Sequence, residues 1–322
     1  RTRAVLVGID DYKSGITGLK GCVNDQFELS AVLQECGFEA ENIRALFNQN
    51  ATASAILDRL RWLFDEANPG DTLVFAYSGH GAQITPRGID GKPQAHIECL
   101  LPHDCDWSPS TLISDANLVQ LYADLPFGVN LVMILDCCHS GGVWRNVGAQ
   151  VRGVPPPDDL RHESLQWNKA EQMWVPRKPK PIDPDNKKFA ESSKLKKATV
   201  GEDGNVVRLG RATPVRSSRE EYVRLRESKG HEGPFTPVVL QACRADQLAS
   251  EYLHGSMTFG VFTYAFTRAL RGLKEKQKPA TVEDMVKLVN AQLKRLNYAQ
   301  EPEVAGPEQL LKLPAREFFH FN

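Results

Sequence analysis

Two stretches decide the fold, residues 72–81 (TLVFAYSGHG) and residues 131–141 (LVMILDCCHSG). Each begins with a continuous apolar run and ends in polar residues and glycine, a pattern typical of a central strand in a parallel sheet. In open α/β sheets, the functional crevice lies just beyond the carboxyl ends of such strands. The pattern therefore predicts that His80 and Cys138 reach the same edge of one sheet, as a Cys–His nucleophile pair requires.

The rest of the chain alternates between strand and helix signals. Thr52 or Ser54 can cap the helix that includes Phe64, and Gly37 can end the helix that runs to Cys36. Thr281 and Asp284 have the spacing of a capping box at the start of a later helix. The expected strands are 4–9, 43–47, 72–77, 131–135 and 237–241, and the expected helices are 24–36, 52–64, 116–122, 258–270 and 281–296. Residues between 78 and 114 are expected to form a loop region. This order predicts an α/β fold, a mostly parallel twisted sheet with helices on both faces.

The stretch 143–235 differs in character from its flanks. Prolines at 155–157 and basic clusters such as Lys194–Lys197 interrupt it, and it shows little apolar periodicity. We interpret it as a long insertion or linker. The expected organisation is a catalytic half at 1–142, the linker at 143–235 and a closing half of the same domain at 236–322.

Composition excludes several classes of protein. The 322 residues carry a formal net charge of −1, so the chain as a whole has no electrostatic attraction to nucleic acid or an anionic membrane. No apolar run approaches the roughly 18 residues of a membrane span, and we interpret the short run at 4–8 as a core strand rather than a signal peptide. The seven cysteines lack the spacing of a disulfide framework, which fits a reducing, cytoplasmic location.

His80 precedes Cys138 by 58 residues, close to the roughly 50 of a caspase-like order. The chain resembles the caspase-like cysteine peptidases, and among them the metacaspases and orthocaspases. The resemblance rests on YSGHG at 77–81, DCCHSG at 136–141 and GCVND at 21–25, with weaker matches at 246–247 and 260–263. It implies a caspase-like fold with a long insertion between its two halves.

Three cysteines compete for the role of nucleophile. Side chains alternate along a strand, so Cys138 shares a face with Asp136 while Cys137 points the other way. In the family pattern, His-Ser-Gly follows the nucleophile, which selects Cys138. Cys243 lies in a QACRA stretch that nearly repeats the caspase signature, but no histidine lies about 50 residues before it. For the base we favour His80 over His139, because successive residues rarely aim at one point.

The resemblance also implies a substrate site. The backbone N–H groups of Gly81 and Cys138 would form the oxyanion hole, although a glycine after the histidine could equally serve only a turn. Asp25 and Asp136 would make an acidic S1 pocket that selects Arg or Lys, with Cys22 and Ser78 as neighbours. A charge favoured at a helix start is the alternative role for Asp25.

Calcium is where the chain departs from its relatives. Calcium-sensitive metacaspases place several aspartates at positions that correspond here to Ile97, Ser114, Asp115 and Arg145. One carboxylate cannot supply the six to eight oxygen ligands of calcium, and the acidic pair Asp104 and Asp106 fits a solvated loop better. We therefore expect calcium independence and neither a metal nor a cofactor in the chemistry.

The predicted function is a cysteine endopeptidase that cleaves proteins or peptides after Arg or Lys. We expect self-cleavage in the linker, around Lys187–Lys197 or Arg208–Arg226, because mobile basic segments are where such a protease cuts. The alternative is a catalytically inactive caspase-like scaffold. A cysteine phosphatase needs an arginine six positions after its nucleophile. The residue six positions after Cys138 is Trp144, which argues against a phosphatase.

Overall fold

The computed structural model describes most of the chain at both ends and only short pieces of its middle. The described residues are 1–13, 15–84, 97–138, 152–155, 165–168, 170, 172–176, 199–200, 205–207, 217–218, 224, 226–231, 234–244, 247–276 and 279–320. His139, Arg145 and Lys187–Lys197 lie outside them, as does nearly all of 208–226.

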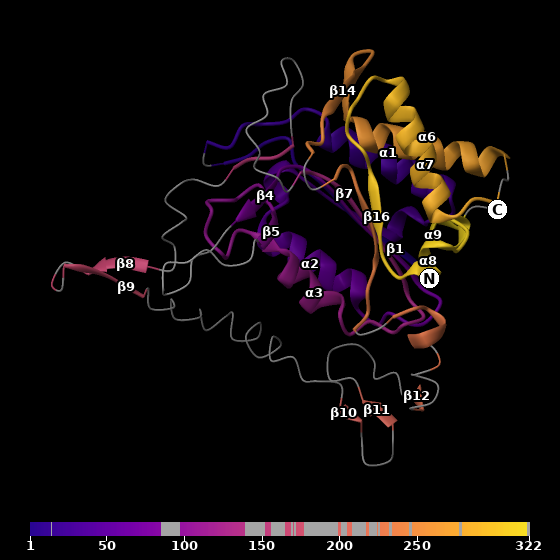
Figure 1. The fold of residues 1–322 in the computed structure, drawn as a ribbon, viewed down its shortest axis with the longest axis horizontal. Coiled ribbons are helices and arrows are strands. Elements are labelled where there is room, and N and C mark those ends of the chain that lie inside the picture. Colours follow the sequence, from indigo (N-terminus) through magenta and orange to yellow (C-terminus); the bar gives the residue numbers. More distant parts are fainter. Residues whose placement is uncertain are drawn as a thin grey trace.

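A six-stranded sheet runs through the centre of the molecule (Figure 1). Its strands, in spatial order, are β16 (Glu303–Ala305), β13 (Val238–Gln241), β7 (Asn130–Asp136), β3 (Thr72–Ser78), β1 (Thr2–Gly8) and β2 (Ile43–Phe47). Neighbouring strands pair in parallel except β16, which is antiparallel to β13. Strands β13 and β16 come from beyond residue 235, so both ends of the chain contribute to one sheet.

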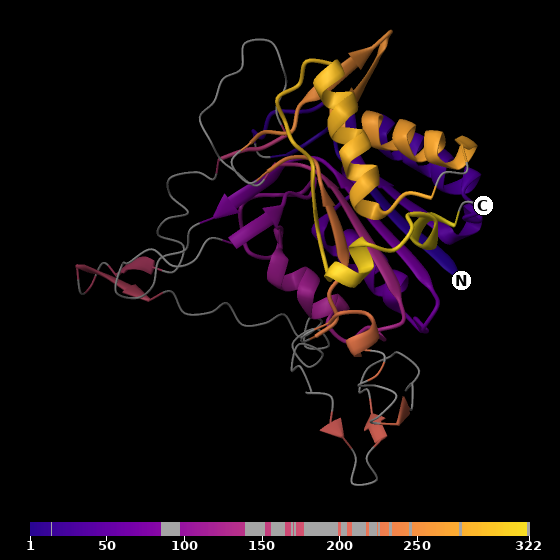
Figure 2. The same ribbon diagram turned by 45° about the vertical axis from the view of Figure 1, so that its right-hand side comes forward.

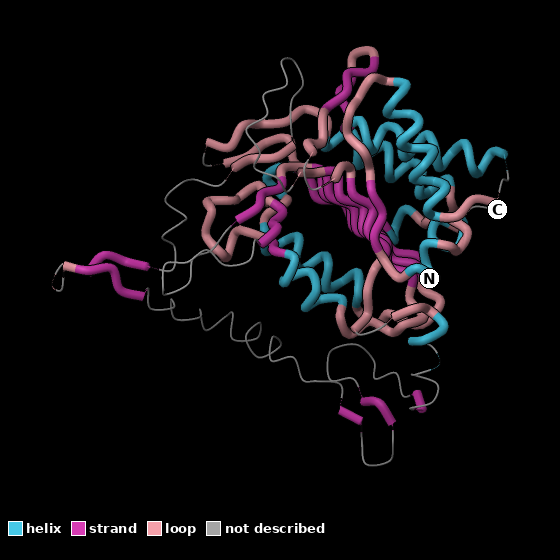
Figure 3. Tube along the Cα trace, in the orientation of Figure 1, coloured by secondary structure: helices cyan, strands magenta, loops and turns pink. Residues whose placement is uncertain are grey.

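Helices cover both faces of this sheet (Figures 2 and 3). On one face, side chains such as Leu73 and Phe75 pack with Ile56 and Leu60. On the other, Val74 and Val132 pack in a second buried cluster. Helices α2 (Ala53–Phe64) and α3 (Asp115–Tyr122) cover the first face; the second carries α1 (Cys22–Glu35), α6 (Val261–Lys276), α7 (Val282–Arg295), α8 (Glu308–Leu311) and α9 (Arg316–Phe319). The continuous apolar runs of the central strands reflect burial on both sides.

The predicted caps are confirmed. Thr52 accepts a hydrogen bond from Ala55 N–H at the start of α2. Thr281 and Asp284 form a reciprocal capping box at the start of α7.

Two of the predicted elements are wrong. The expected loop region after residue 78 contains a three-stranded antiparallel sheet made of β4 (Gly81–Ile84), β5 (Ile97–Leu100) and β6 (Ile113–Ser114). The helix expected to begin at Thr258 begins instead at Val261, because β15 (Met257–Gly260) pairs antiparallel with β14 (Glu251–His254). Gly255 turns this hairpin with φ of 62°, and a Gly-Ser pair between two short strands is itself a hairpin signal.

The remaining short elements are the 3-10 turns η1 (Ala40–Asn42) and η2 (Asn48–Asn50) and two small sheets within 143–235. These sheets consist of β8 (Leu165–Asn168) with β9 (Met173–Pro176), and of β10 (Thr199–Val200), β11 (Asn205–Val207) and β12 (Ser217–Ser218). None of the described helices has the length and hydrophobicity needed to cross a membrane.

Candidate active site

His80 and Cys138 follow the ends of two adjacent strands. In the pairing of β3 with β7, the last partners are Ser78 and Asp136, and each of the two residues lies two positions further on. The N–H of Gly79 donates to the Asp136 carbonyl at 3.4 Å, so the two chain segments stay together past the ladder. The structure therefore brings His80 and Cys138 to the same sheet edge.

One carbonyl oxygen joins the two chain segments. The oxygen of Arg152 accepts hydrogen bonds from the backbone N–H of Cys138 at 2.9 Å and from that of Gly81 at 3.3 Å. Two convergent N–H donors of this kind are what an oxyanion hole supplies to a developing negative charge. Gly81 and Cys138, the two residues expected to form such a hole, thus direct their N–H groups at one oxygen.

The side chain of Arg152 lies in a pocket of three carboxylates. It is completely buried. Its Nη1 is 2.7 Å from Asp25 Oδ2 and 3.2 Å from Asp136 Oδ2. Its Nη2 is 3.5 Å from Glu251 Oε1, an ion-pair contact. Asp25 and Asp136, expected in one acidic pocket, thus contact the same guanidinium, and the structure adds Glu251 to them.

Each carboxylate is also held by donors of the surrounding elements. Gly260 N–H donates to Asp25 at 2.8 Å. Thr263 donates to Asp136 through its N–H at 3.1 Å and its hydroxyl at 2.6 Å. The N–H groups of Lys20 and Gly21 donate to Glu251 at 3.0 and 2.8 Å. These bonds fix the three acids before any ligand enters, which is the preorganisation that binding a cation needs.

Burial and mutual repulsion act on the ionisation of the pocket. Burial raises the pKa of Asp25 to about 7; the Arg152 guanidinium opposes this shift and the nearby Asp136 adds to it. Burial works to lower the pKa of Arg152, but Asp136 and Asp25 outweigh it and raise that pKa well above its usual value. The guanidinium in the pocket is therefore charged.

His80 is buried as a neutral imidazole. Burial lowers its pKa to about 4. Its Nε2 lies 2.8 Å from the carbonyl oxygen of Thr17, and because a carbonyl can only accept, Nε2 carries the proton. Its Nδ1 is buried and has no hydrogen-bond partner among the described residues. The free lone pair of Nδ1 can accept a proton, as a general base must.

The cysteines divide between the two faces of the sheet, as the strand alternation predicts. Cys137 belongs to the cluster under α2 and α3, and Cys138 to the opposite cluster. The Cys138 sulfur contacts the backbone of Ala249. Cys243 lies just past the end of β13 and hydrogen-bonds to the Cys138 side chain, which, with burial, raises the pKa of Cys243 far above its usual value. Cys243 is thus a neighbour of Cys138.

The other two expected pocket residues lie beside the pocket. Cys22 is the first residue of α1, and burial raises the pKa of its thiol well above the usual value, with Arg152 opposing. Ser78 is buried, and its hydroxyl accepts a hydrogen bond from Gln26 at 2.8 Å.

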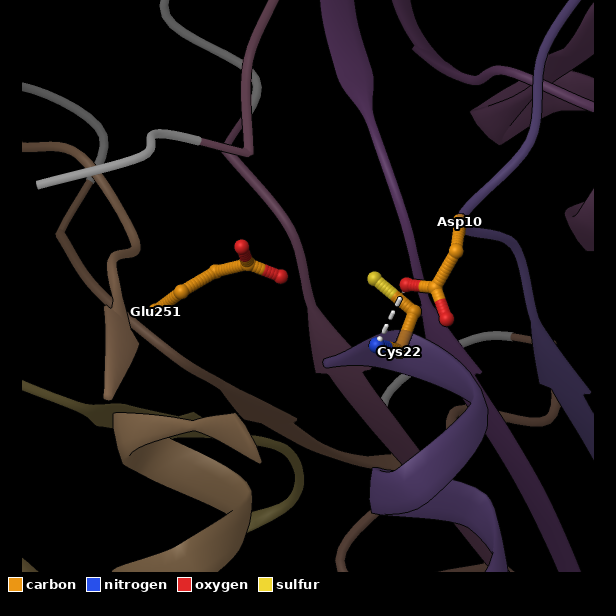
Figure 4. A group of neighbouring side chains, drawn as sticks. All are labelled: Asp10, Cys22 and Glu251. Carbon is orange, nitrogen blue, oxygen red and sulfur yellow. Dashed lines mark hydrogen bonds between the residues drawn. The ribbon is translucent and has the colours of Figure 1, made fainter. Parts of the chain in front are cut away.

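Asp10, Cys22 and Glu251 could in principle hold a metal, since their ligand atoms lie within 4.8 Å of one another (Figure 4). Asp10, however, caps α1 by accepting from Cys22 N–H at 2.8 Å and Val23 N–H at 3.2 Å. Glu251 accepts two N–H groups and faces a guanidinium. Asp10 is thus engaged at the start of α1 and Glu251 with Arg152, so these two carboxylates already serve other partners.

Four positions align with calcium ligands of metacaspases. Of these, Ile97 is the first residue of β5, Ser114 caps α3 and Asp115 is the first residue of α3. The fourth, Arg145, lies outside the described residues.

Arg152 and Glu251 were not predicted from the sequence, and no role was predicted for Gly260 and Thr263. Gly260 has a steric reason: a Cβ there would overlap the Asp136 carboxylate and lie 2.5 Å from Arg152 Nη1. The weak match at 260–263 was the available signal for Gly260 and Thr263.

This constellation on a caspase-like sheet defines the class of the protein. The caspase-domain model matches residues 1–311, and the chain belongs to that family. Within it, the chain is 33% identical over 175 residues to metacaspase-2 of Trypanosoma brucei brucei, covering 49% of each protein. It is 35% identical over 150 residues to metacaspase-1 of Schizosaccharomyces pombe (44% of this chain, 34% of that protein) and over 156 residues to metacaspase-8 of Arabidopsis thaliana (46% and 39%).

The resemblance to metacaspases is thereby confirmed. The matched region spans less than half of the length of each of these relatives. A solved structure, that of protein GSU0716 from Geobacter sulfurreducens, superposes with a TM-score of 0.59 at 19% identity. The match covers 98% of this chain and 97% of that one. At this identity the likeness concerns the fold alone, and the caspase-like architecture is shown by the family model.

Proposed function

We propose that this protein is a cysteine endopeptidase that cleaves polypeptides after Arg or Lys, with Cys138 as nucleophile and His80 as general acid and base. The observation that carries the proposal is the environment of Arg152. Its carbonyl oxygen accepts two N–H donors next to Cys138, while its guanidinium lies among three buried carboxylates. A substrate residue at the cleaved bond must likewise place its carbonyl oxygen at these two N–H groups and its side chain among the carboxylates.

The proposed chemistry gives each group one role. His80 Nδ1 takes the Cys138 proton, and the thiolate attacks the carbonyl carbon of the residue in the pocket. The oxygen gains negative charge, which the N–H groups of Cys138 and Gly81 stabilise. The bond to the next nitrogen then breaks, and His80 protonates the departing amine. Water hydrolyses the resulting thioester, releasing a carboxylate and restoring the thiol.

The pocket sets the specificity. A guanidinium or ammonium brought between Asp25, Asp136 and Glu251 is compensated by nearby charge, whereas a substrate aspartate would meet three like charges. Arg fits best, because its planar fork can bind two carboxylates at once.

Three further features belong to the proposal. The enzyme processes itself within 143–235, acts without calcium, and works in the cytoplasm on protein or peptide substrates rather than on nucleic acid or at a membrane. All seven cysteines are free thiols, which is the state maintained in a reducing compartment.

A positional-scanning peptide library tests the proposal with the purified full chain and Cys138→Ala as the control. We expect cleavage after Arg and Lys, none after Asp, and none by the variant. An Arg-directed acyloxymethyl ketone should add its mass to the peptide that contains Cys138. A folded protein that cleaves no peptide and takes up no label would instead be a caspase-like scaffold.

A further inference from the structure

Arg152 is held in the site as a substrate residue would be. Its N–H donates to the carbonyl of Ala249 at 3.0 Å, and its own carbonyl accepts from Cys138 and Gly81. Two residues on, Val154 N–H donates to the carbonyl of Gly81 at 3.1 Å. Backbone and side chain are therefore both engaged, and main-chain bonds of this kind are how a protease holds an extended peptide.

The bond that follows Arg152 lies beside the backbone of the proposed nucleophile. Its carbonyl is bound by the N–H of the proposed nucleophile residue itself. Gly153 is the next residue, and it forms a parallel bridge with Gly81, the residue after the proposed base. The leaving nitrogen of an Arg152–Gly153 cleavage therefore belongs to a residue without a side chain, close to His80.

The pocket can release the side chain of Arg152 as well as hold it. Arg152 is the largest fully buried side chain described. Among the described residues, however, its Nε has no hydrogen-bond partner, and its Nη2 makes an ion-pair contact without a hydrogen bond. Three carboxylates face one guanidinium, so the pocket keeps its negative charge when this arginine departs. While it remains, no other basic side chain can enter the pocket.

We propose that Arg152–Gly153 is the bond that this protein cleaves in itself, and that Arg152 keeps the site closed to other substrates until that bond is cut. The proposal rests on the proposed function and moves the self-cleavage site from the expected 187–197 or 208–226 to the start of the linker. Cys138 Sγ bonds to the Arg152 carbonyl carbon, and the bond to the Gly153 nitrogen breaks. Gly153 leaves as an amine with a proton from His80. Water then hydrolyses the thioester, so that one fragment ends in Arg152 and the other begins at Gly153.

The test compares full-length variants by intact mass and N-terminal sequencing during incubation at neutral pH. Wild type should yield a fragment beginning Gly153-Val154, and Cys138→Ala should stay intact. Arg152→Lys should still be cut, because it keeps the positive charge, while Arg152→Gln and Gly153→Pro should not be cut at this bond. Arg161→Gln and Arg211→Gln are matched controls in the same segment and should behave as wild type.

A second readout separates closure from cleavage. Labelling of Cys138 by the Arg-directed acyloxymethyl ketone should show a lag in freshly prepared wild type and be at least tenfold faster at the start in Arg152→Gln. A circular-dichroism melt checks that each variant is folded. Gly153→Pro covers the case in which Arg152→Gln fails to fold, and it should label as slowly as uncut wild type throughout.

The outcomes distinguish the two proposals. Wild type that turns over Arg peptides while Arg152–Gly153 stays intact, or that is cut only at other residues, overturns this inference and leaves the peptidase in place. Folded wild type and Arg152→Gln that both fail to cleave peptides and to take up the label overturn the proposed function itself.

Discussion

Gly260 lies against the carboxylate of Asp136 so closely that a side chain at position 260 would occupy the place of the bound guanidinium. The same residue donates its N–H to Asp25 at 2.8 Å. One backbone position thus both holds an acid of the pocket and leaves the space that the cation fills.

Gly260→Ala should therefore reduce kcat/KM for Arg peptides at least a hundredfold, because the methyl group overlaps both Asp136 and the ligand. Gly272→Ala is the matched control. Gly272 lies in α6, and a Cβ added there would meet nothing within 4 Å, while alanine favours a helix by roughly 0.5–1 kcal/mol. Equal activity of the two variants in a fluorogenic peptide assay would contradict the steric role of Gly260.

Cys138→Ala should abolish peptide cleavage, since loss of a covalent nucleophile costs many orders of magnitude in rate. Cys137→Ala and Cys243→Ala should retain it, because Cys137 faces the opposite side of the sheet and Cys243 only neighbours the reacting sulfur. Initial rates normalised to folded protein measure the difference. A folded Cys137→Ala variant as inactive as Cys138→Ala would show that the nucleophile is misassigned.

Asp25→Asn, Asp136→Asn and Glu251→Gln should each weaken cleavage after Arg. Truncating one partner of a buried charge pair costs about 2–5 kcal/mol, which is roughly 30-fold to several thousand-fold in kcat/KM. Glu251 should give the smallest loss, because its contact of 3.5 Å is the longest of the three. Asp58→Asn, an exposed acid on α2, should leave kinetics unchanged. A wild type that prefers to cleave after Asp would refute an acidic pocket.

The acid limb of the pH–rate profile should belong to Asp25 and lie at pH 7 or above, because Arg152 opposes the rise of the Asp25 pKa to about 7 and no longer does so once it has left the pocket. A raised carboxyl pKa means that the group takes up a proton as pH falls through that range, so the pocket loses negative charge and kcat/KM for Arg peptides decreases. His80 stays neutral until about pH 4 and contributes no limb above that. Measuring kcat/KM between pH 5 and 8 tests this. The limb should disappear in Asp25→Asn, and a limb that survives there belongs to another group.

Activity should be the same with excess chelator and with millimolar calcium. At the positions aligned with calcium ligands, Ile97 has no oxygen on its side chain and Ser114 is engaged in capping α3. Peptide turnover in the two buffers, measured on one protein preparation, decides the question. A several-fold stimulation by calcium would mean that other carboxylates bind it.

The central strands and the placement of His80 and Cys138 were predictable because they depend on local pattern. Apolar runs such as 131–135 specify buried strands whatever the rest of the chain does. Short elements such as β4 and β15 were not predicted, since their pairing depends on partners and turns rather than on long periodicity. Asp25 and Asp136 were found through motifs, which also implied that they lie together, and what the structure adds is Glu251 and the guanidinium of Arg152 between them.

Arg152 and Glu251 could not be found in this way. Each comes from a stretch without strong pattern, and each gains its meaning from residues far away in the sequence: Arg152 from Asp25, and Glu251 from Gly21. An arginine in a proline-rich basic segment looks like many others until the fold shows which one reaches the carboxylates.

The parallel pairing of β7 with β13, Val132 beside Val238, has a consequence for how the molecule comes apart. Most of the sequence between these two neighbours is the segment 143–235. In an intact chain, that connection keeps the two strands at a high effective concentration, and unfolding is a unimolecular event. Once any bond in the segment is broken, the sheet joins two separate polypeptides. Unfolding then becomes dissociation, its midpoint depends on protein concentration, and a diluted, melted sample should regain its fold far more slowly than the uncut chain.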